Sequence, residues 1–135
     1  MTLSKGDVVL VPFPFTDLSQ TKLRPAIVLW VDLNGNDVAL CFISSQNLDS
    51  LQLGEILLDP SEPEFAATQL KHASKIRVTR IVTLERRLIT RLLGHLEVHY
   101  LQQLNTQMIR SFSYPDMIAL PLTSTLIALT LQTQH

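Results

Sequence analysis

The chain has 135 residues, of which 46% are hydrophobic and 17% charged, and its formal net charge is −1. This length suits one domain with its own core and is too short for two ordinary domains, and the hydrophobic share excludes a disordered chain. The near-neutral balance excludes nucleic-acid binding through overall charge, so any such binding depends on a local basic surface.

Charge is distributed unevenly along the sequence. Most of the acids precede Leu70, whereas the segment 71–91 holds one acid, Glu85, among seven basic residues: Lys71, Lys75, Arg77, Arg80, Arg86, Arg87 and Arg91. This asymmetry predicts one face of the protein that attracts phosphates.

We expect neither a targeting signal nor a membrane anchor in this sequence. Residues 1–5 lead directly into an apolar strand-like segment, so we expect no secretion signal and a cytoplasmic protein. The longest apolar stretch, 117–131, is broken by Pro121 and is shorter than the roughly 20 residues that cross a bilayer. The single cysteine, Cys41, lies in an apolar segment and is predicted to be a small core hydrophobe.

The first predicted strand is Asp7–Phe13, a nearly continuous apolar run ended by Pro12 and Pro14. Residues 16–22 are predicted to form a polar loop. Two further strands follow, residues 25–32 and 37–44, separated by Leu33-Asn34-Gly35-Asn36. Because Asn-Gly between such segments is the strongest short-range hairpin signal, these two strands are predicted to pair antiparallel.

The length of the hairpin loop decides which residues face each other at its open end. With a two-residue Asn34-Gly35 loop, Arg24 lies opposite Ser45. With a three-residue loop and the glycine in a bulge, the pairing shifts and Arg24 faces Ser44. In both cases an arginine and a serine share one face of the sheet.

Shorter elements follow the hairpin. We expect a strand over residues 55–58, a turn over 59–63 and a helical turn over 65–70. The alternation in residues 75–84 predicts a strand with Ile76, Val78 and Ile81 inward and Lys75, Arg77 and Thr79 outward.

The last strand and a helix complete the predicted domain. Residues 88–93 are predicted to form a strand that leads to Gly94. From Glu97 the period changes, and an amphipathic helix is predicted from Val98, Leu101, Leu104, Met108 and Phe112. Short strands followed by one helix predict a mainly β fold, a small barrel with a C-terminal helix packed on it.

Several kinds of catalytic site lack sequence support. The acids are scattered without a D-x-D pair, so we expect no metal site, and the chain has no G-x-S-x-G, P-loop or C-x-x-C motif.

The open end of the hairpin remains as a candidate catalytic site. Pro25 restricts Arg24 to extended geometry, and a guanidinium beside a hydroxyl suits a phosphate oxyanion. If the phosphate belongs to RNA, the 2′-hydroxyl of the RNA is the nucleophile, so no metal-bound water is required.

Four segments in order, Gly6-Asp-Val-Val-Leu-Val11, Pro12-Phe-Pro-Phe-Thr-Asp17, Leu23-Arg-Pro-Ala-Ile-Val28 and Ile43-Ser-Ser-Gln46, resemble the PemK/MazF toxin family of type II toxin-antitoxin systems. Residues 75–84 extend the resemblance, which spans roughly residues 5–112. It implies an SH3-like barrel of the plasmid maintenance toxin fold and a homodimer. It also implies metal-independent, cofactor-free, sequence-selective cleavage of single-stranded RNA, such as mRNA, by 2′-hydroxyl attack.

The resemblance also assigns roles to residues. The family's arginine falls on Arg24 and its strand-end threonine or serine on Ser44, which favours the three-residue loop or a bulge. Some members carry a glutamate five residues before the arginine, where this chain has Ser19. We expect substrate contacts from Ser45 and Gln46 and phosphate contacts from Lys22, Lys75, Arg77 and Arg80, for which a solvated basic face is the alternative.

The resemblance further implies a domain over residues 1–112, an extension of unassigned role over 113–135, and a cognate antitoxin with an acidic segment. For two aromatic residues near the loop, Phe13 and Phe15, base stacking is an alternative to core packing, whereas Trp30 is expected in the core or a dimer interface. The competing function is a catalytically degenerate barrel that binds protein or nucleic acid, for example one that poisons DNA gyrase.

Overall fold

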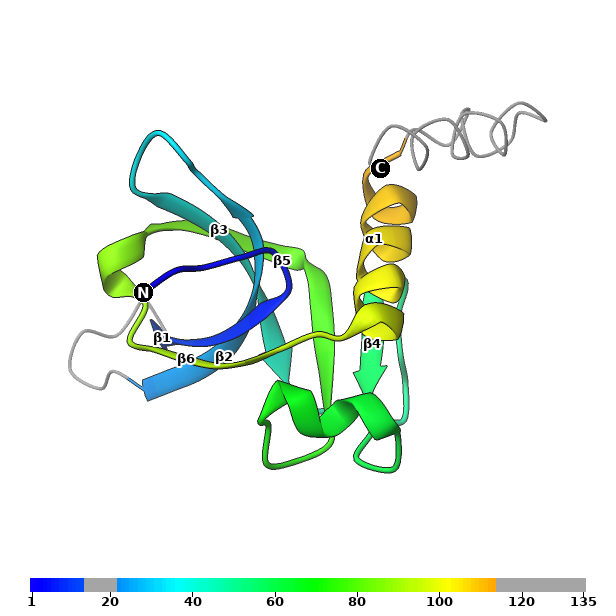
Figure 1. Cartoon of the computed structure of the whole chain (residues 1–135). Helices are drawn as coiled ribbons and strands as arrows, with labels where there is room; N and C mark the ends of the chain where they lie inside the picture. The colour runs from blue at the N-terminus through cyan, green and yellow to red at the C-terminus, as the bar shows by residue number, and fades with distance from the viewer. Residues whose placement is uncertain (14–21, 114–135) are drawn as a thin grey trace.

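The computed structural model describes residues 1–13 and 22–113 (Figure 1). These residues form one six-stranded antiparallel sheet with the strand order β4-β5-β3-β2-β1-β6. In chain order the elements are β1 (Asp7–Phe13), β2 (Lys22–Val31), β3 (Asp37–Ser44), β4 (Glu55–Leu58), the 3-10 helix η1 (Pro63–Thr68), β5 (Ser74–Glu85), the 3-10 helix η2 (Arg86–Leu88), β6 (Arg91–His95) and α1 (Val98–Phe112).

The sheet curves into a half-barrel, and α1 stands beside β4 at one end of it (Figure 1). This confirms the predicted mainly β fold with a C-terminal helix. Within the described residues no helix is long and apolar enough to cross a membrane. The expectations for Phe15, Ser19, most of the 16–22 loop and the tail beyond Ser113 concern residues outside the described ranges.

β2 begins at Lys22 rather than at Pro25, because its first residues pair with β1 through Phe13↔Lys22, Val11↔Arg24 and Leu10↔Pro25. Arg24 therefore lies inside a paired strand and not at a strand start, which corrects the sequence-based expectation. Pairing with Val11 of β1 holds the backbone of Arg24 in addition to the restriction by Pro25.

The β2–β3 turn has neither of the two expected loop lengths. Asp32 N–H donates to Asp37 O at 2.9 Å and closes residues 33–36 into a loop. Asn34 N–H donates to Asp32 Oδ1 at 3.0 Å, so a side-chain turn replaces an Asn-Gly turn with positive φ.

A bulge in β2 then sets the register at the open end of the hairpin. Trp30 pairs with Ala39, but beyond the bulge Val28 pairs with Leu40 and Ala26 with Phe42. The bulge shifts the pairing by one residue. Two residues beyond Ala26 and Phe42, on the same face, stand Arg24 and Ser44. The register thus agrees with the Arg24–Ser44 alternative.

The two faces of the sheet are covered differently. On one face, α1 and η1 pack on the strands, and Tyr100 and Leu104 of α1 are fully buried there. Inside the half-barrel a second cluster forms around Val9, Val28 and Leu40. Tyr100 Oη accepts a hydrogen bond from Asp59 N–H at 3.3 Å. The packed face of α1 differs from the predicted one. Tyr100 is buried, whereas Val98 and Phe112, which were expected on the packed face, are more than half exposed.

Other expectations meet mixed outcomes. Ile76, Val78 and Cys41 are fully buried as predicted, whereas Ile81 is 42% exposed and Trp30 is 52% exposed, which excludes Trp30 from the core. Ile81 follows an irregularity in which β3 pairing jumps from Arg77 to Ile81, and this turns the strand. The strand expected over 88–93 is present but begins later, as β6 from Arg91 to His95, and Leu88 belongs to η2.

Candidate active site

Arg24 belongs to a row of side chains at one end of the sheet. Its guanidinium carbon lies 5.4 Å from the centroid of the Phe13 ring, a cation–π contact. The Phe13 ring in turn lies 5.1 Å from that of Phe42. Because alternate residues of a strand share a face, Ser44 stands on the same face as Phe42. Three strands thus bring Arg24 and Ser44 to one end of the half-barrel.

The charge of Arg24 is available to a ligand. The residue is exposed, and within the described ranges it forms no ion pair with a carboxylate. The Phe13 ring limits where the guanidinium can move without neutralising it. This arrangement suits an anion with oxygens spaced for a planar two-pronged donor.

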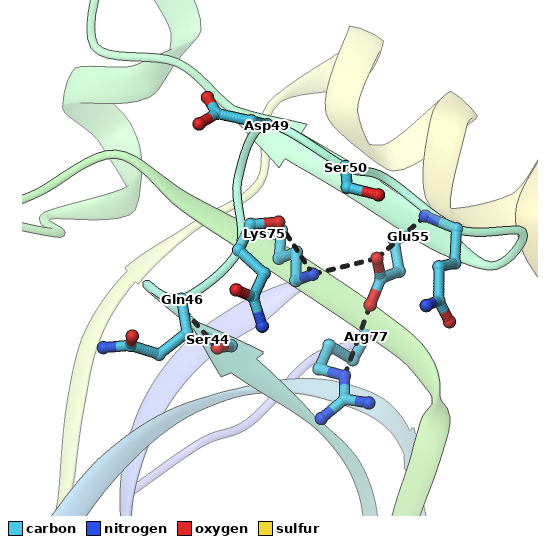
Figure 2. A pocket seen from close by; sticks show the side chains of 9 residues that line it. Ser44, Gln46, Asp49, Ser50, Glu55, Lys75 and Arg77 are labelled. Carbon is cyan, nitrogen blue, oxygen red and sulfur yellow. Dashed lines mark hydrogen bonds and ion pairs between the residues drawn. The ribbon is translucent and has the colours of Figure 1, made fainter.

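Ser44 opens onto a pocket of about 620 Å³, which we call the Ser44 pocket (Figure 2). Its lining combines hydroxyl, amide and charged groups: Ser44, Gln46, Asn47, Asp49, Ser50, Gln52, Glu55, Lys75 and Arg77. Ser44 Oγ accepts a hydrogen bond from Gln46 N–H at 3.1 Å, which holds the chain as it leaves β3. The amide groups of this lining are able to read the edge of a base.

Glu55 organises the charges of the Ser44 pocket. Its Oε1 lies 3.0 Å from Lys75 Nζ and its Oε2 lies 3.3 Å from Arg77 Nε, as the dashed lines in Figure 2 mark. Burial by itself would raise the pKa of Glu55. Hydrogen bonds from Gln52 N–H and the Lys75 ammonium, with the charges of Lys75 and Arg77, outweigh that effect and lower the pKa below its ordinary value.

Lys75 differs from the sequence-based expectation. It is only 5% exposed, so the prediction that it faces solvent is wrong. Its side chain does point away from the face of Ile76, as alternation requires, but the chain between β3 and β4 closes over it, and Lys75 Nζ donates to Asn47 O at 3.2 Å. Glu55 was not predicted as a site residue, and its position opposite Arg77 depends on pairing between β4 and β5.

Ser45 lines a different pocket, which we call the Arg91 pocket. It measures about 360 Å³, and Arg24 also contributes to its lining. The full lining is Leu10, Arg24, Pro25, Ile43, Ser45, Gln69, Leu70, Lys71, His72, Ser74, Arg91 and Leu93. Lys71 and Arg91 were not predicted as site residues, although both lie in the basic segment of the sequence.

The remaining predicted substrate contacts lie apart from the two pockets. Lys22 is exposed at the start of β2, opposite Phe13, and Arg80 is exposed within the irregular part of β5. The structure therefore gathers Ser44, Gln46, Lys75 and Arg77 in one pocket and Arg24 with Ser45 in the other.

The three histidines in the described residues, His72, His95 and His99, do not form a cluster with other potential metal ligands. His95 and His99 are four residues apart, but His95 belongs to β6 and only His99 to α1, where it pairs with Glu64. Among the residues that the structure describes, no three His, Cys, Asp or Glu side chains converge as metal ligands would.

Comparison with known proteins adds two kinds of similarity. The family model described as the PemK-like, MazF-like toxin of type II toxin-antitoxin system matches residues 4–112. An endoribonuclease from mycobacterial species has a similar structure, with a TM-score of 0.59 and 16% identity over 82% of this chain and 91% of that one. An endoribonuclease in complex with its cognate antitoxin, also from mycobacterial species, gives a TM-score of 0.62 and 15% identity over 84% and 100%. No curated protein sequence matches.

At these identities the two solved structures establish a shared fold. The family match is a sequence-level relationship, and it spans β1 through α1, including both members of the Arg24–Ser44 pair. The chain therefore belongs to the PemK-like, MazF-like family of type II toxin-antitoxin toxins.

Proposed function

We propose that this toxin is a metal-independent endoribonuclease that cleaves single-stranded RNA, including mRNA, at selected sequences. The observation that carries the proposal is the exposed Arg24 guanidinium, held 5.4 Å from the Phe13 ring and free of any carboxylate in the described residues, at the strand end that also displays Ser44. The endoribonuclease activity of two proteins of the same fold supports it.

The chemistry that suits this pair is transesterification by the RNA itself. The 2′-oxygen forms a bond to the adjacent phosphorus, the bond from phosphorus to the 5′-oxygen breaks, and a proton moves from the 2′-hydroxyl to solvent or a base while the leaving oxygen gains one. Arg24 stabilises the extra charge on the phosphorane, and Ser44 donates a hydrogen bond to it. A guanidinium donates hydrogen bonds and accepts none, so the role of Arg24 is electrostatic.

Sequence selectivity needs groups that read base edges. We assign this role to Ser45 and to Gln46, which lines the Ser44 pocket. Arg77 lines the same pocket, and 38% of its side-chain surface is exposed and accessible to RNA. Lys75 acts instead as a positioning residue, since its ammonium is committed to Glu55 and Asn47. Lys22 and Arg80 contact phosphates farther along the RNA. Because both side chains are exposed, each contact contributes modestly to RNA affinity and weakens with added salt.

The same proposal covers the assembly and the partners. Residues 1–112 form the toxin domain and 113–135 a C-terminal extension, and the toxin acts in the cytoplasm as a homodimer. Its antitoxin has an acidic segment that competes with RNA for Arg24 and its neighbours, because carboxylates and phosphates are attracted by the same cations. A solved structure of the same fold contains a cognate antitoxin, which supports this partner.

The deciding experiment incubates the pure protein with a long single-stranded RNA in EDTA and maps the new ends. We expect fragments with 2′,3′-cyclic phosphate and 5′-hydroxyl ends at a small set of sequences. A matched RNA with a single 2′-deoxynucleotide before one mapped site should lose cleavage at that site alone. A protein that leaves every RNA intact in EDTA contradicts the proposal and favours the competing function, a binding module that has lost cleavage.

A further inference from the structure

The Arg91 pocket and the Ser44 pocket lie at the same end of the sheet, and Arg24 lines the first while Ser44 lines the second. Ser44 and Lys75 line the Ser44 pocket, while their chain neighbours Ser45 and Ser74 line the Arg91 pocket. Successive residues at a strand end project to opposite sides, which explains the separation. A ligand that engages Arg24 and Ser44 therefore has two continuations, one into each pocket.

Charge distinguishes the two continuations for a polyanion. The Ser44 pocket carries two acids, Asp49 and Glu55, and its Lys75 is already paired with Glu55. The Arg91 pocket carries Arg24, Lys71 and Arg91 and no aspartate or glutamate. Neither Lys71 nor Arg91 forms an ion pair with any carboxylate in the described parts of the chain. A phosphate is therefore attracted to the Arg91 pocket more strongly.

The shape and lining of the Arg91 pocket also suit a nucleotide. Its volume of about 360 Å³ lies within the range of small-ligand sites. Apolar side chains form much of the surface, on which the flat face of a base can lie: Leu10, Pro25, Ile43, Leu70 and Leu93. Hydroxyl and amide groups of Ser45, Gln69 and Ser74 stand among them and can meet a base edge.

We propose that the Arg91 pocket is a nucleotide subsite for the RNA strand next to the scissile phosphate. The base lies on the apolar surface, and Lys71 and Arg91 bind the phosphate of that nucleotide. The inference rests on the proposed ribonuclease function and extends it, because it places the nucleotide on one side of the scissile phosphate beside Lys71 and Arg91.

Charge reversal with a matched control tests the phosphate contacts. The variants are Lys71→Glu and Arg91→Glu, and the control is Arg110→Glu, an exposed arginine of α1 with the same charge change that lines neither pocket. The probe is a 2′-O-methyl RNA, which has no free 2′-hydroxyl to react. We expect the Kd for this RNA, measured by fluorescence anisotropy, to rise about tenfold or more for each pocket variant. The slope of log Kd against log salt concentration should fall by the amount that about one phosphate contact contributes. The control should stay near wild type.

A second variant tests the base contact. Leu70→Gln changes a half-buried wall residue, and melting curves report whether the variant folds. An RNA with one abasic nucleotide beside the mapped cleavage position should bind the wild type more weakly. In Leu70→Gln the abasic RNA and the intact RNA should bind equally well, because the substitution and the missing base remove the same contact and their effects on affinity do not add.

Each outcome bears on the inference separately from the cleavage assay. If the protein cleaves no RNA but its RNA binding depends on Lys71 and Arg91, the result supports the nucleotide subsite. The same result contradicts the ribonuclease proposal. A protein that cleaves RNA, with both pocket variants equal to the Arg110→Glu control, overturns the subsite alone. Variants that lose only antitoxin affinity and keep RNA binding also overturn it, because the pocket is then a peptide site.

Discussion

Glu55 Oε1 lies 3.0 Å from Lys75 Nζ, and each of these side chains exposes only 7% of its surface. The pair joins β4 to β5 and, through the hydrogen bond from Lys75 to Asn47, fixes the chain that covers Lys75 and lines the Ser44 pocket. Removing the charge of Glu55 is costly, because it leaves the buried Lys75 ammonium with the Asn47 carbonyl and without a countercharge.

Glu55→Gln should therefore destabilise the fold strongly. We expect a loss of about 3 kcal/mol or more in the free energy of unfolding, measured by urea denaturation. A Glu55→Leu/Lys75→Met double variant should recover most of that loss. The control is Glu85→Gln in the exposed pair with Arg87, which should change stability by less than about 1 kcal/mol. Equal losses for Glu55→Gln and Glu85→Gln would contradict a buried pair.

The pH dependence of stability should carry the signature of Glu55. Its folded-state pKa is lower than its unfolded one, so its contribution is complete above the unfolded pKa and is lost as the pH falls through the folded pKa. Denaturation of the wild type from pH 7 to pH 3 should show stability falling below about pH 5. The slope should be smaller in Glu55→Gln. An identical slope in the variant would exclude Glu55 from this effect.

Cys41 should be chemically silent in the native state. Burial raises the pKa of its thiol to about 12, so almost no thiolate is present at pH 8. We expect a thiol-specific reagent to react with it only after denaturant is added. Reaction of the native protein at the rate of a free thiol would show that the β3 core opens readily.

The predicted homodimer can be tested at one exposed apolar surface. Trp30 is 52% exposed and Leu33 is 91% exposed, and both line a groove of about 620 Å³ near Leu3. Trp30→Glu should convert the dimer to a folded monomer in light scattering, because the substitution adds charge to a contact without disturbing the core. Leu53→Glu, at a 73% exposed residue that lines no described pocket, is the control. A monomeric wild type at micromolar concentration would contradict the dimer itself.

Local sequence signals predicted the elements that depend on them. Alternating and β-branched segments placed Asp7–Phe13, Asp37–Ser44 and Glu55–Leu58 with the bounds that the structure shows. The Asn-Gly signal identified the hairpin. The β2 bulge depends on how β2 and β3 pair, and it decides that Ser44 rather than Ser45 stands opposite Arg24.

Burial was harder to predict than secondary structure. Alternation placed Lys75 on the face opposite Ile76, yet no local pattern indicates that a loop from another strand covers it and that Glu55 pairs with it. In α1 the apolar period gave the helix but not its rotation, which follows from the position of Tyr100 against the sheet and Asp59. Both outcomes depend on contacts between elements far apart in sequence.

The central claim is that Arg24 stabilises the transition state of RNA cleavage, and its most direct test is a cleavage time course with Arg24→Ala and Arg24→Lys beside Arg110→Ala. Arg24 is exposed, so Arg24→Ala should change stability by no more than about 1 kcal/mol. Cleavage in EDTA should fall by roughly 10² to 10³, with partial rescue by lysine, which keeps the charge but loses the two-pronged geometry. The Arg110→Ala control should cleave normally. A folded Arg24→Ala protein that cleaves RNA at the wild-type rate would contradict the account.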